Sequence, residues 1–403
     1  MSYYSHEKMP VLRKNKICFV TTIPIFARAF LIHYMRELSK ENEVFLISRF
    51  DEIKTDREFF KGVTLVDMPM VRKISLLADL RMLVKMYLFF RRERFDIVHS
   101  GTPKAGLLAM VSARVAGVPL RFHTFTGQVW ATKAGIFRWL LKNIDKVIYR
   151  CASDVLVDSH SQRDFLIQEG IIEEKGSYVL AQGSICGVDA DRFKPDAKQK
   201  AAVRDRLHIP VDAFVFFFLG RICKDKGIEE LLPAFDRIAR EHSDAYLLLV
   251  GPDEEKMILK MKQHVLFQNG RILHEGFTRT PELYMSAADV MCLPSHREGF
   301  GMVVLEAAAA GIPTIGSRIT GVIDAIEDGE TGLIHPKGDI DALCECMRLC
   351  ITDRERTRHL GRQARARTLK NFSSQRLTEE FLKYYKIKIN QAHDYGSKLS
   401  MKA

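Results

Sequence analysis

The sequence lacks the signatures of several large protein classes. Its eight cysteines are scattered over 403 residues. Cys344, Cys346 and Cys350 share one predicted helix, but no second cluster completes a zinc site. We interpret all eight as reduced thiols of a cytosolic protein. No Gly-x-Gly-x-x-Gly follows the first strand of either half, which argues against a nicotinamide enzyme, and no Walker loop is present.

Long apolar runs are missing as well. The first 16 residues are polar, no cleavable signal follows them, and the first predicted strand is too short to cross a bilayer. No other segment reaches the apolar length of a transmembrane helix, so we expect none.

Acidic residues are outnumbered, with 50 Asp and Glu against 61 Lys and Arg, which gives a formal net charge of +11. Such a charge implies an anionic partner, which could be nucleic acid, an acidic membrane face or a phosphorylated substrate. The chain shows no pattern of stacking aromatics suited to bases, so we expect no nucleic acid partner.

Short apolar runs alternate with helical patterns in two series, which is typical of doubly wound parallel sheets. The first series comprises strands at 16–22, 43–48, 63–67, 95–99, 120–124, 155–157 and 178–180. The second comprises strands at 214–219, 246–250, 272–275, 290–293 and 314–315. The sequence therefore predicts an α/β protein with two Rossmann-like domains that face a cleft.

The domain boundaries follow from this pattern. Residues 1–186 form the predicted N-terminal domain, with 1–16 as a loose tail, and the polar stretch 187–196, interrupted by Pro195, is the candidate hinge. Residues 197–376 form the C-terminal domain. A last helix is predicted at 377–390, and 391–403 is predicted to be disordered.

The most informative stretch is Ser295–Gly316, which follows the apolar strand 290–293. It turns through Glu298-Gly299-Phe300-Gly301 and enters an Ala-rich helix at Met302 that stops at Gly311. A strand, a glycine-rich turn and a helix N-terminus together make an anion site. Glu298 and Glu306 bracket this turn, and a carboxylate accepts hydrogen bonds from vicinal hydroxyls. The stretch therefore predicts a ligand with phosphate and sugar parts.

The string EGFGMVVLEA, followed by AGIPTIGS, resembles the E-x7-E motif of retaining GT-B glycosyltransferases of family 4. The resemblance implies that Glu298 lies near the donor sugar and that Glu306 binds the ribose. It also implies donor diphosphate binding by the turn, whose residues are Gly299, Phe300, Gly301 and Met302. The resemblance spans most of the chain, and in the GT-B fold the last helix crosses back to the first domain.

Arg221 and Lys226 follow the strand 214–219 and precede a helix. A guanidinium and an ammonium at a strand's carboxyl end can clamp a diphosphate, although the pair could also be solvated charges in a polar turn. The resemblance favours the clamp, because the family carries GR-x4-KG at this place. The same resemblance assigns Phe277, after the strand 272–275, to the nucleotide base.

His123 ends an apolar strand, in HTFTG followed by QVW, a pattern similar to a family 4 subgroup that builds bacterial surface polysaccharides such as O-antigen. In that subgroup the His faces the donor sugar. Trp130 is either an acceptor-side residue or a packing residue. TTIPIFARAF after the first strand departs from the family's Gly-Gly loop, so no contacts are assigned there. Asp189-Ala190-Asp191 falls in the hinge, and we do not interpret it as a metal site.

Two stretches combine an apolar stripe with basic residues: 71–95, with Leu76, Leu77, Leu80, Leu83, Val84, Tyr87 and Leu88, and 133–150. Either both helices bury their stripes in the first domain, or they meet an acidic membrane surface.

The resemblance thus implies a retaining, metal-independent glycosyltransferase without a cofactor. It would move a hexose or N-acetylhexosamine from a UDP-sugar to a glycan or polyprenyl-diphosphate acceptor, in the cytoplasm at the inner membrane face. The alternatives are a nucleotide-sugar epimerase of the same fold and a non-catalytic basic binding module.

Overall fold

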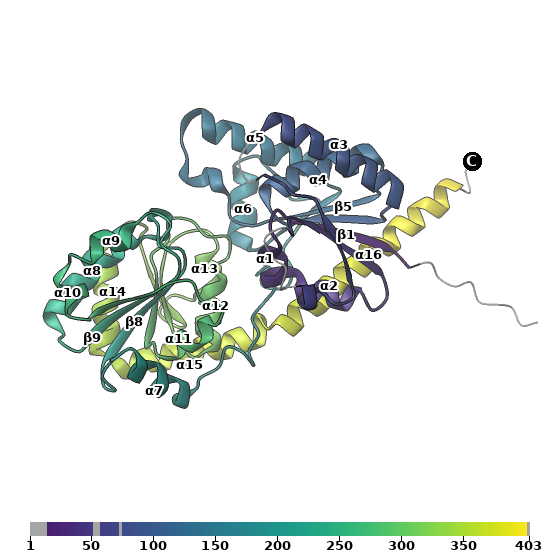
Figure 1. Cartoon of the computed structure of the whole chain (residues 1–403). Coiled ribbons are helices and arrows are strands. Elements are labelled where there is room, and N and C mark those ends of the chain that lie inside the picture. Colours follow the sequence, from purple (N-terminus) through teal and green to yellow (C-terminus); the bar gives the residue numbers. More distant parts are fainter. Residues whose placement is uncertain (1–13, 51–56, 72–74, 401–403) are drawn as a thin grey trace, which may run out of the picture. The chain divides into compact units, whose positions relative to one another are not determined.

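The computed structural model describes residues 14–50, 57–71 and 75–400 (Figure 1). The predicted N-terminal tail lies outside these ranges except for residues 14–16.

The first sheet has seven strands in the order β3-β2-β1-β4-β5-β6-β7. Ile17 of β1 lies opposite Val44 of β2 and Ile97 of β4, in parallel register. Residues 17–20 are fully buried, as expected of a parallel strand that is covered on both faces. The strands are β1 (Lys16–Val20), β2 (Glu43–Ser48), β3 (Val63–Asp67), β4 (Ile97–Ser100), β5 (Leu120–Phe125), β6 (Asp154–Val157) and β7 (Ser177–Tyr178).

Helices and short turns connect these strands (Figure 1). After β1 the chain passes through a π-helical turn, Ala27–Leu31, a feature that is rare and often found at functional sites. The helices are α1 (Pro24–Phe26), α2 (Ile32–Leu38), α3 (Leu76–Glu93), α4 (Pro103–Ala116), α5 (Gly135–Cys151) and α6 (His160–Gln168).

The second sheet has six parallel strands in the order β10-β9-β8-β11-β12-β13. Its last strand, β13, was not predicted, because it has only four residues, of which the first is a glycine and the last is His335. The strands are β8 (Phe214–Leu219), β9 (Ala245–Val250), β10 (Ile272–Glu275), β11 (Val290–Leu293), β12 (Thr314–Ser317) and β13 (Gly332–His335). The predicted pair of doubly wound parallel sheets is confirmed.

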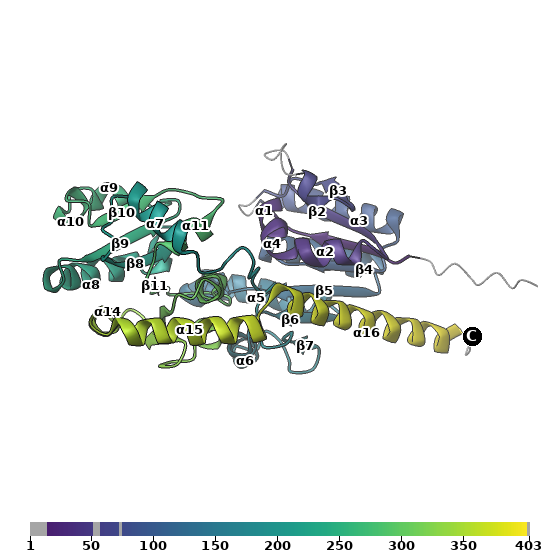
Figure 2. The same cartoon turned by 90° about the horizontal axis from the view of Figure 1, so that it is seen from below.

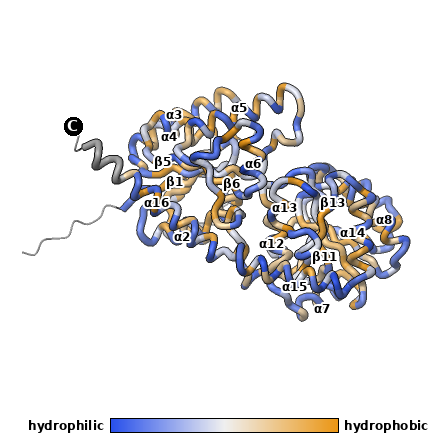
Figure 3. The backbone as a smooth tube through the Cα atoms, turned by 180° about the vertical axis from the view of Figure 1, so that it is seen from behind, coloured by the Kyte–Doolittle hydropathy of each residue, from blue (hydrophilic) through white to orange (hydrophobic). Residues whose placement is uncertain are grey.

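Alternate residues of β8 supply the two cores of this domain. Phe214, Phe216 and Phe218 pack on one face, with α8 (Ile228–Glu241) and α14 (Ile340–Thr352). Val215 and Phe217 pack on the other, with α12 (Met302–Ala309). The apolar colouring of β11 in Figure 3 is consistent with strands buried on both faces.

Further helices complete this part of the chain. α14 and α15 (Arg354–Asn371) lie next to each other (Figure 2). The remaining helices are α7 (Ala197–Arg206), α9 (Met257–Met261), α10 (Val265–Gln268), α11 (Pro281–Ser286) and α13 (Val322–Ala325).

The chain divides into two compact units. One comprises residues 1–123, 150–154 and 386–403, and the other comprises 124–149 and 155–385. The stretch 187–196 lies inside the second unit. A domain boundary at 187–196 therefore stays a prediction.

The last helix, α16 (Ser374–Ser400), contributes residues to both units. Within the first unit, Lys388 Nζ lies 2.6 Å from Asp154 Oδ1. The segment that was predicted to be disordered from residue 391 is helical as far as Ser400, because it continues the turns of the preceding helix and contains no proline. Among the described helices, none combines the length and hydropathy of a membrane span.

Candidate active site

The strand order of the second sheet reverses between β8 and β11, and the predicted site residues follow these two strands. Arg221 and Lys226 come after β8, and Glu298 comes after β11. In open α/β sheets, ligands bind at the carboxyl ends of strands where the order reverses. The fold therefore brings together two segments that lie more than 70 residues apart, as the Lys226–Glu298 hydrogen bond across 72 positions shows.

A glycine lets these two loops touch. Gly227 has φ +73°, and a Cβ there would lie 2.0 Å from the carbonyl oxygen of Pro294. Any other residue at this place would push the loop after β8 away from the loop after β11. Gly227, the last glycine of the GR-x4-KG motif, is thus needed for the two loops to come into contact.

Glu298 is held by two donors. Lys226 Nζ lies 2.5 Å from Glu298 Oε1, and Ser295 Oγ donates to the same oxygen at 2.8 Å. The side chains of Lys226 and Glu298 are only 17% and 12% exposed, so the pair is shielded from solvent. Ser295 was not singled out in the sequence, although its position three residues before Glu298 is a signal that could have found it.

Arg221 has an acidic partner that the sequence analysis missed. Its Nη1 lies 2.7 Å from Oε2 of Glu254, which follows β9. Both side chains are about two-fifths exposed, at 42% and 43%, and exposed pairs of this kind are weak. Arg221 can therefore exchange Glu254 for an anionic ligand at little cost.

The glycine turn leads into α12 as predicted. Gly301 caps the helix with φ +79°, a left-handed conformation that favours glycine. The Phe300 side chain is buried and lies 5.5 Å from the ring of Phe372, so only its backbone is available to a ligand. Ser184 Oγ donates to Met302 Sδ at 3.0 Å, which fixes the first residue of the helix.

Three other segments of the second unit lie close to Gly299, two through their backbone and one through the side chain of Asp158. A Cβ on Gly299 would lie 2.5 Å from Asp158 Oδ2 and 2.8 Å from the nitrogen of Gly127. A Cβ on Gly321 would lie 2.0 Å from the carbonyl oxygen of Gly299. Gly321 N donates to Ser161 Oγ at 2.8 Å, which holds this contact in place. Sequence reasoning had no signal for these neighbours, because they come from distant loops.

Asp158 is a buried carboxyl beside the turn. Burial raises its pKa well above the usual value, and the nearby carboxylates Asp324 and Glu298 raise it further. The backbone N–H of Asp158 opposes this effect. Asp158 is therefore a group that gains a proton readily, next to the loop that carries Glu298.

Glu306 lies on α12, and its carboxylate accepts no hydrogen bond from any residue that the structure describes. Burial raises its pKa to about 7, Arg192 lowers it and Glu282 raises it. A partly buried carboxylate without a donor is costly unless a ligand supplies one. The ribose-binding prediction for Glu306 is consistent with this environment and stays a prediction.

His123 belongs to the first unit. It lies on β5, 2% exposed, with Nδ1 2.8 Å from Ser100 Oγ on β4. Burial lowers the pKa of His123 to about 3, so the imidazole is neutral near pH 7. His99 has a pKa of about 3 as well, which is lowered by burial and then by His123.

The structure also shows the surroundings of Trp130, Phe277 and Asp189. Trp130 is 1% exposed, its Nε1 donates to Asp145 Oδ2 at 2.7 Å and its ring stacks on Phe165, so it is a packing residue. Phe277 follows β10 and is 68% exposed, which leaves its ring available for a base. In the stretch 187–196, Asp189 Oδ1 accepts hydrogen bonds from the backbone of Asp191 and Arg192, as in a turn.

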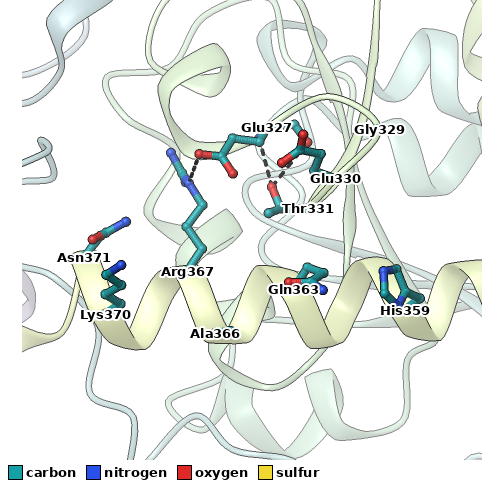
Figure 4. A pocket seen from close by; sticks show the side chains of 10 residues that line it. All are labelled: Glu327, Gly329, Glu330, Thr331, His359, Gln363, Ala366, Arg367, Lys370 and Asn371. Carbon is teal, nitrogen blue, oxygen red and sulfur yellow. Dashed lines mark hydrogen bonds and ion pairs between the residues drawn. The ribbon is translucent and has the colours of Figure 1, made fainter.

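A hollow of about 570 Å³ lies elsewhere in the second unit, against α15 (Figure 4). Figure 4 shows Arg367 directed at Glu327, and their Nε and Oε1 atoms lie 2.7 Å apart. None of the predicted site residues lines this hollow. It is therefore not part of the candidate active site.

Family models match both halves of the chain. Residues 199–367 match the model described as glycosyl transferases group 1, and residues 32–179 match a glycosyl transferase 4-like domain. The chain is 34% identical over 319 residues to the capsular polysaccharide biosynthesis glycosyltransferase CapM of Staphylococcus aureus, covering 79% of this chain and 83% of CapM. It is 27% identical over 307 residues to the UDP-Gal:alpha-D-GlcNAc-diphosphoundecaprenol alpha-1,3-galactosyltransferase of Escherichia coli, covering 75% and 78% of the two chains.

Solved structures share the fold. Sucrose-phosphate synthase from Thermosynechococcus elongatus superposes with a TM-score of 0.81 at 20% identity, over 94% of this chain and 100% of that chain. Anabaena HepE in complex with UDP gives a TM-score of 0.76 at 19% identity, over 93% and 100%. At these identities the likeness concerns the fold alone.

Proposed function

The chain belongs to the glycosyltransferases of family 4 with the GT-B fold, and from this premise we propose that it transfers a sugar from a UDP-sugar to a glycan or polyprenyl-diphosphate acceptor, with retention of configuration. The transferred sugar is a hexose or an N-acetylhexosamine. The observation that carries the proposal is the contact of Lys226 with Glu298 at the reversal point of the second sheet, where Lys226 lies on the loop that also carries Arg221.

In this proposal Arg221 and Lys226 bind the donor diphosphate together with the backbone of the turn 299–302. Both cations are paired with carboxylates in the structure, Arg221 with Glu254 and Lys226 with Glu298. The donor diphosphate would form ion pairs with both cations in place of these carboxylates. Glu298 would then be able to contact the sugar. The cations would also stabilise the charge that builds on the leaving diphosphate, which is the service that a metal ion gives in other transferases.

Glu306 binds the ribose and Phe277 contacts the base in the same proposal. The two carboxylate oxygens of Glu306 accept no hydrogen bond from a described residue, so each can accept one from a ribose hydroxyl. Neutral His123 acts on the donor sugar, where an uncharged imidazole can exchange hydrogen bonds without attracting a counterion. No protein nucleophile is assigned. The acceptor hydroxyl therefore attacks the sugar carbon on the face from which the diphosphate departs, and an oxygen of the departing diphosphate takes the proton of that hydroxyl.

The acceptor and the place of action are proposed from the relatives. CapM is named for capsular polysaccharide biosynthesis, and the Escherichia coli relative for a diphosphoundecaprenol acceptor. We infer that this chain acts in polysaccharide biosynthesis on a lipid-linked acceptor at the inner face of the cell membrane. The net charge of +11 supports a site that attracts anions.

The donor is tested by thermal melting with a panel of nucleotides and nucleotide sugars, in EDTA. A ligand at about a hundred times its dissociation constant adds ~2.7 kcal/mol of stability. We expect a selective rise in melting temperature with UDP and with one UDP-sugar. A rise with nucleic acid in place of any nucleotide would contradict the proposal and favour a binding module.

The reaction is tested with that UDP-sugar and a polyprenyl-diphosphate acceptor. UDP release that requires the acceptor, with an α-linked product from an α-linked donor by NMR, is the expected result. Conversion of the donor sugar without an acceptor would identify an epimerase instead.

Donor affinity should depend on the protonation of Glu306. Its pKa is about 7, and the carboxylate, not the neutral acid, accepts both ribose hydrogen bonds. Affinity for the UDP-sugar is therefore expected to be full above pH 7 and to fall below it, by at most about tenfold per pH unit. Titration calorimetry across this range measures the effect, since a UDP-sugar has no terminal phosphate that titrates there.

The matched variant for this measurement is Glu306→Gln. It keeps the size of the side chain and removes its titration. We expect weaker binding with a flat pH profile, and an unchanged slope in the variant would assign the pH dependence to another group.

A further inference from the structure

The outer face of α3 carries a continuous row of exposed apolar side chains. Exposed fractions are 83% for Leu76, 72% for Leu77, 59% for Leu80, 51% for Val84 and 58% for Leu88. The spacing of four residues between Leu76, Leu80, Val84 and Leu88 places them along one side of the helix. Folding of the first unit does not cover this row.

The opposite side of α3 is the one that packs. Met86 and Phe90 are buried, and Ser112 of α4 donates to the carbonyl oxygen of Leu83. Figure 1 shows α3 beside α4 in the first domain. The helix therefore has two apolar sides, of which the core needs only one, and an uncovered side of this size marks an interaction surface.

The charges on α3 indicate what covers that side. Arg81, Lys85 and Arg91 are exposed, and none of them forms an ion pair with a residue that the structure describes. The acidic side chains of the helix are already neutralised: Asp79 lies 2.7 Å from Lys104, and Glu93 lies 3.4 Å from Lys16. The outer face thus presents apolar and cationic groups together.

We propose that the outer face of α3 docks in the interface of an acidic phospholipid membrane. The leucines and Val84 enter the boundary between headgroups and acyl chains, while Arg81, Lys85 and Arg91 contact lipid phosphates. A second copy of the chain is a poorer occupant, because a symmetric contact would bring the same cations against one another. The proposal deepens the proposed function, since it rests on an acceptor that is held in a bilayer.

The second basic stretch is less suited to this role. α5 exposes Ile136, Phe137 and Trp139, but two of its cations are already paired, because Arg138 and Lys142 lie 2.9 Å and 2.5 Å from the carboxylate of Glu169. Its surface therefore offers fewer available cations for lipid phosphates. Of the two predicted stripes, the one on α3 is therefore the better candidate for membrane docking.

The test is co-sedimentation of the full chain with vesicles of phosphatidylglycerol and phosphatidylcholine, against phosphatidylcholine alone. We expect binding to the acidic vesicles that weakens as salt is raised. A double variant Leu80→Ser and Val84→Ser should lose most of the binding without loss of fold, because both side chains are exposed. Its control is Val211→Ser with Leu259→Ser, which removes apolar groups that are more exposed still (79% and 62%) from the second unit.

The charge variant Arg81→Glu with Lys85→Glu should weaken binding to acidic vesicles by roughly 25-fold or more, at about fivefold for each basic residue lost. Arg358→Glu with Arg362→Glu makes the same change in net charge on α15 and should have a much smaller effect. Equal losses in the two charge variants would mean that net charge acts without a docking face, and would overturn the proposal.

Other outcomes also decide the question. Wild-type chain that stays in the supernatant with acidic vesicles, or a dimer that the α3 variants dissociate in light scattering, would overturn membrane docking. The α3 variants should keep the melting shift with the UDP-sugar. Failure of docking is therefore distinguishable from failure of the proposed function, which would remove that shift from the wild-type chain.

Discussion

Lys226→Ala is expected to lower the turnover number by about 10²–10³, the loss that follows removal of one group stabilising charge in a transition state. Lys226 has two tasks in the proposed reaction, since it neutralises the leaving diphosphate and holds Glu298 Oε1 at 2.5 Å. Without it, Glu298 keeps only the hydrogen bond from Ser295. Release of UDP under saturating donor measures the effect.

Lys224→Ala is the matched control. Lys224 lies on the same loop, is 68% exposed and pairs with Glu229 at 3.1 Å on the surface. Because exposed ion pairs contribute little, its activity and melting temperature should stay near those of the wild type. A Lys226→Ala enzyme within tenfold of wild-type turnover would remove Lys226 from the site.

Gly321→Ala is expected to destabilise the second unit by about 3 kcal/mol and to abolish donor binding. The φ of +84° with ψ −51° is a backbone conformation that costs an L-residue about 1–3 kcal/mol, and an inserted methyl that forces its surroundings to move costs about 1–3 kcal/mol. The added Cβ would lie 2.0 Å from the carbonyl oxygen of Gly299, so the turn that leads into α12 must shift. Thermal melting with and without the UDP-sugar measures both losses.

Gly329→Ala separates the two costs. Gly329 also has a positive φ, +80°, but a Cβ there meets no atom within 4 Å. It should lose about 1–2 kcal/mol of stability and keep donor binding. If the Gly321 variant behaved like the Gly329 variant, the contact between residue 321 and the turn would have no functional weight.

The candidate site was predictable where its chemistry is local in sequence. Glu298, Gly301 and Glu306 lie within one strand–turn–helix segment, so their spacing and the turn conformation follow from a few consecutive residues. Arg221 and Lys226 were found for the same reason, as a short loop after an apolar strand. That these two loops meet depends on the placement of β8 beside β11, a long-range pairing that no local pattern contains.

Other residues of the site could not be predicted from the hydrophobic periodicity of the sequence. Glu254, Asp158 and Gly321 are ordinary loop residues in the sequence, and they matter only because distant loops bring them to Arg221 or to the turn at Gly299. The burial of Trp130 against Phe165 likewise required two segments to meet. Local patterns cannot rank such residues, since their environment is made by other parts of the chain.

By itself, the sequence determined the α/β class, the two series of strands and the anion-binding turn, because apolar runs, glycines and helix signals act over a few residues. The tertiary structure alone decided which side of α3 is buried, which carboxylate holds each cation and which glycines cannot be replaced. These depend on packing between segments far apart in the chain, where burial and close contact, rather than residue type, set the energy.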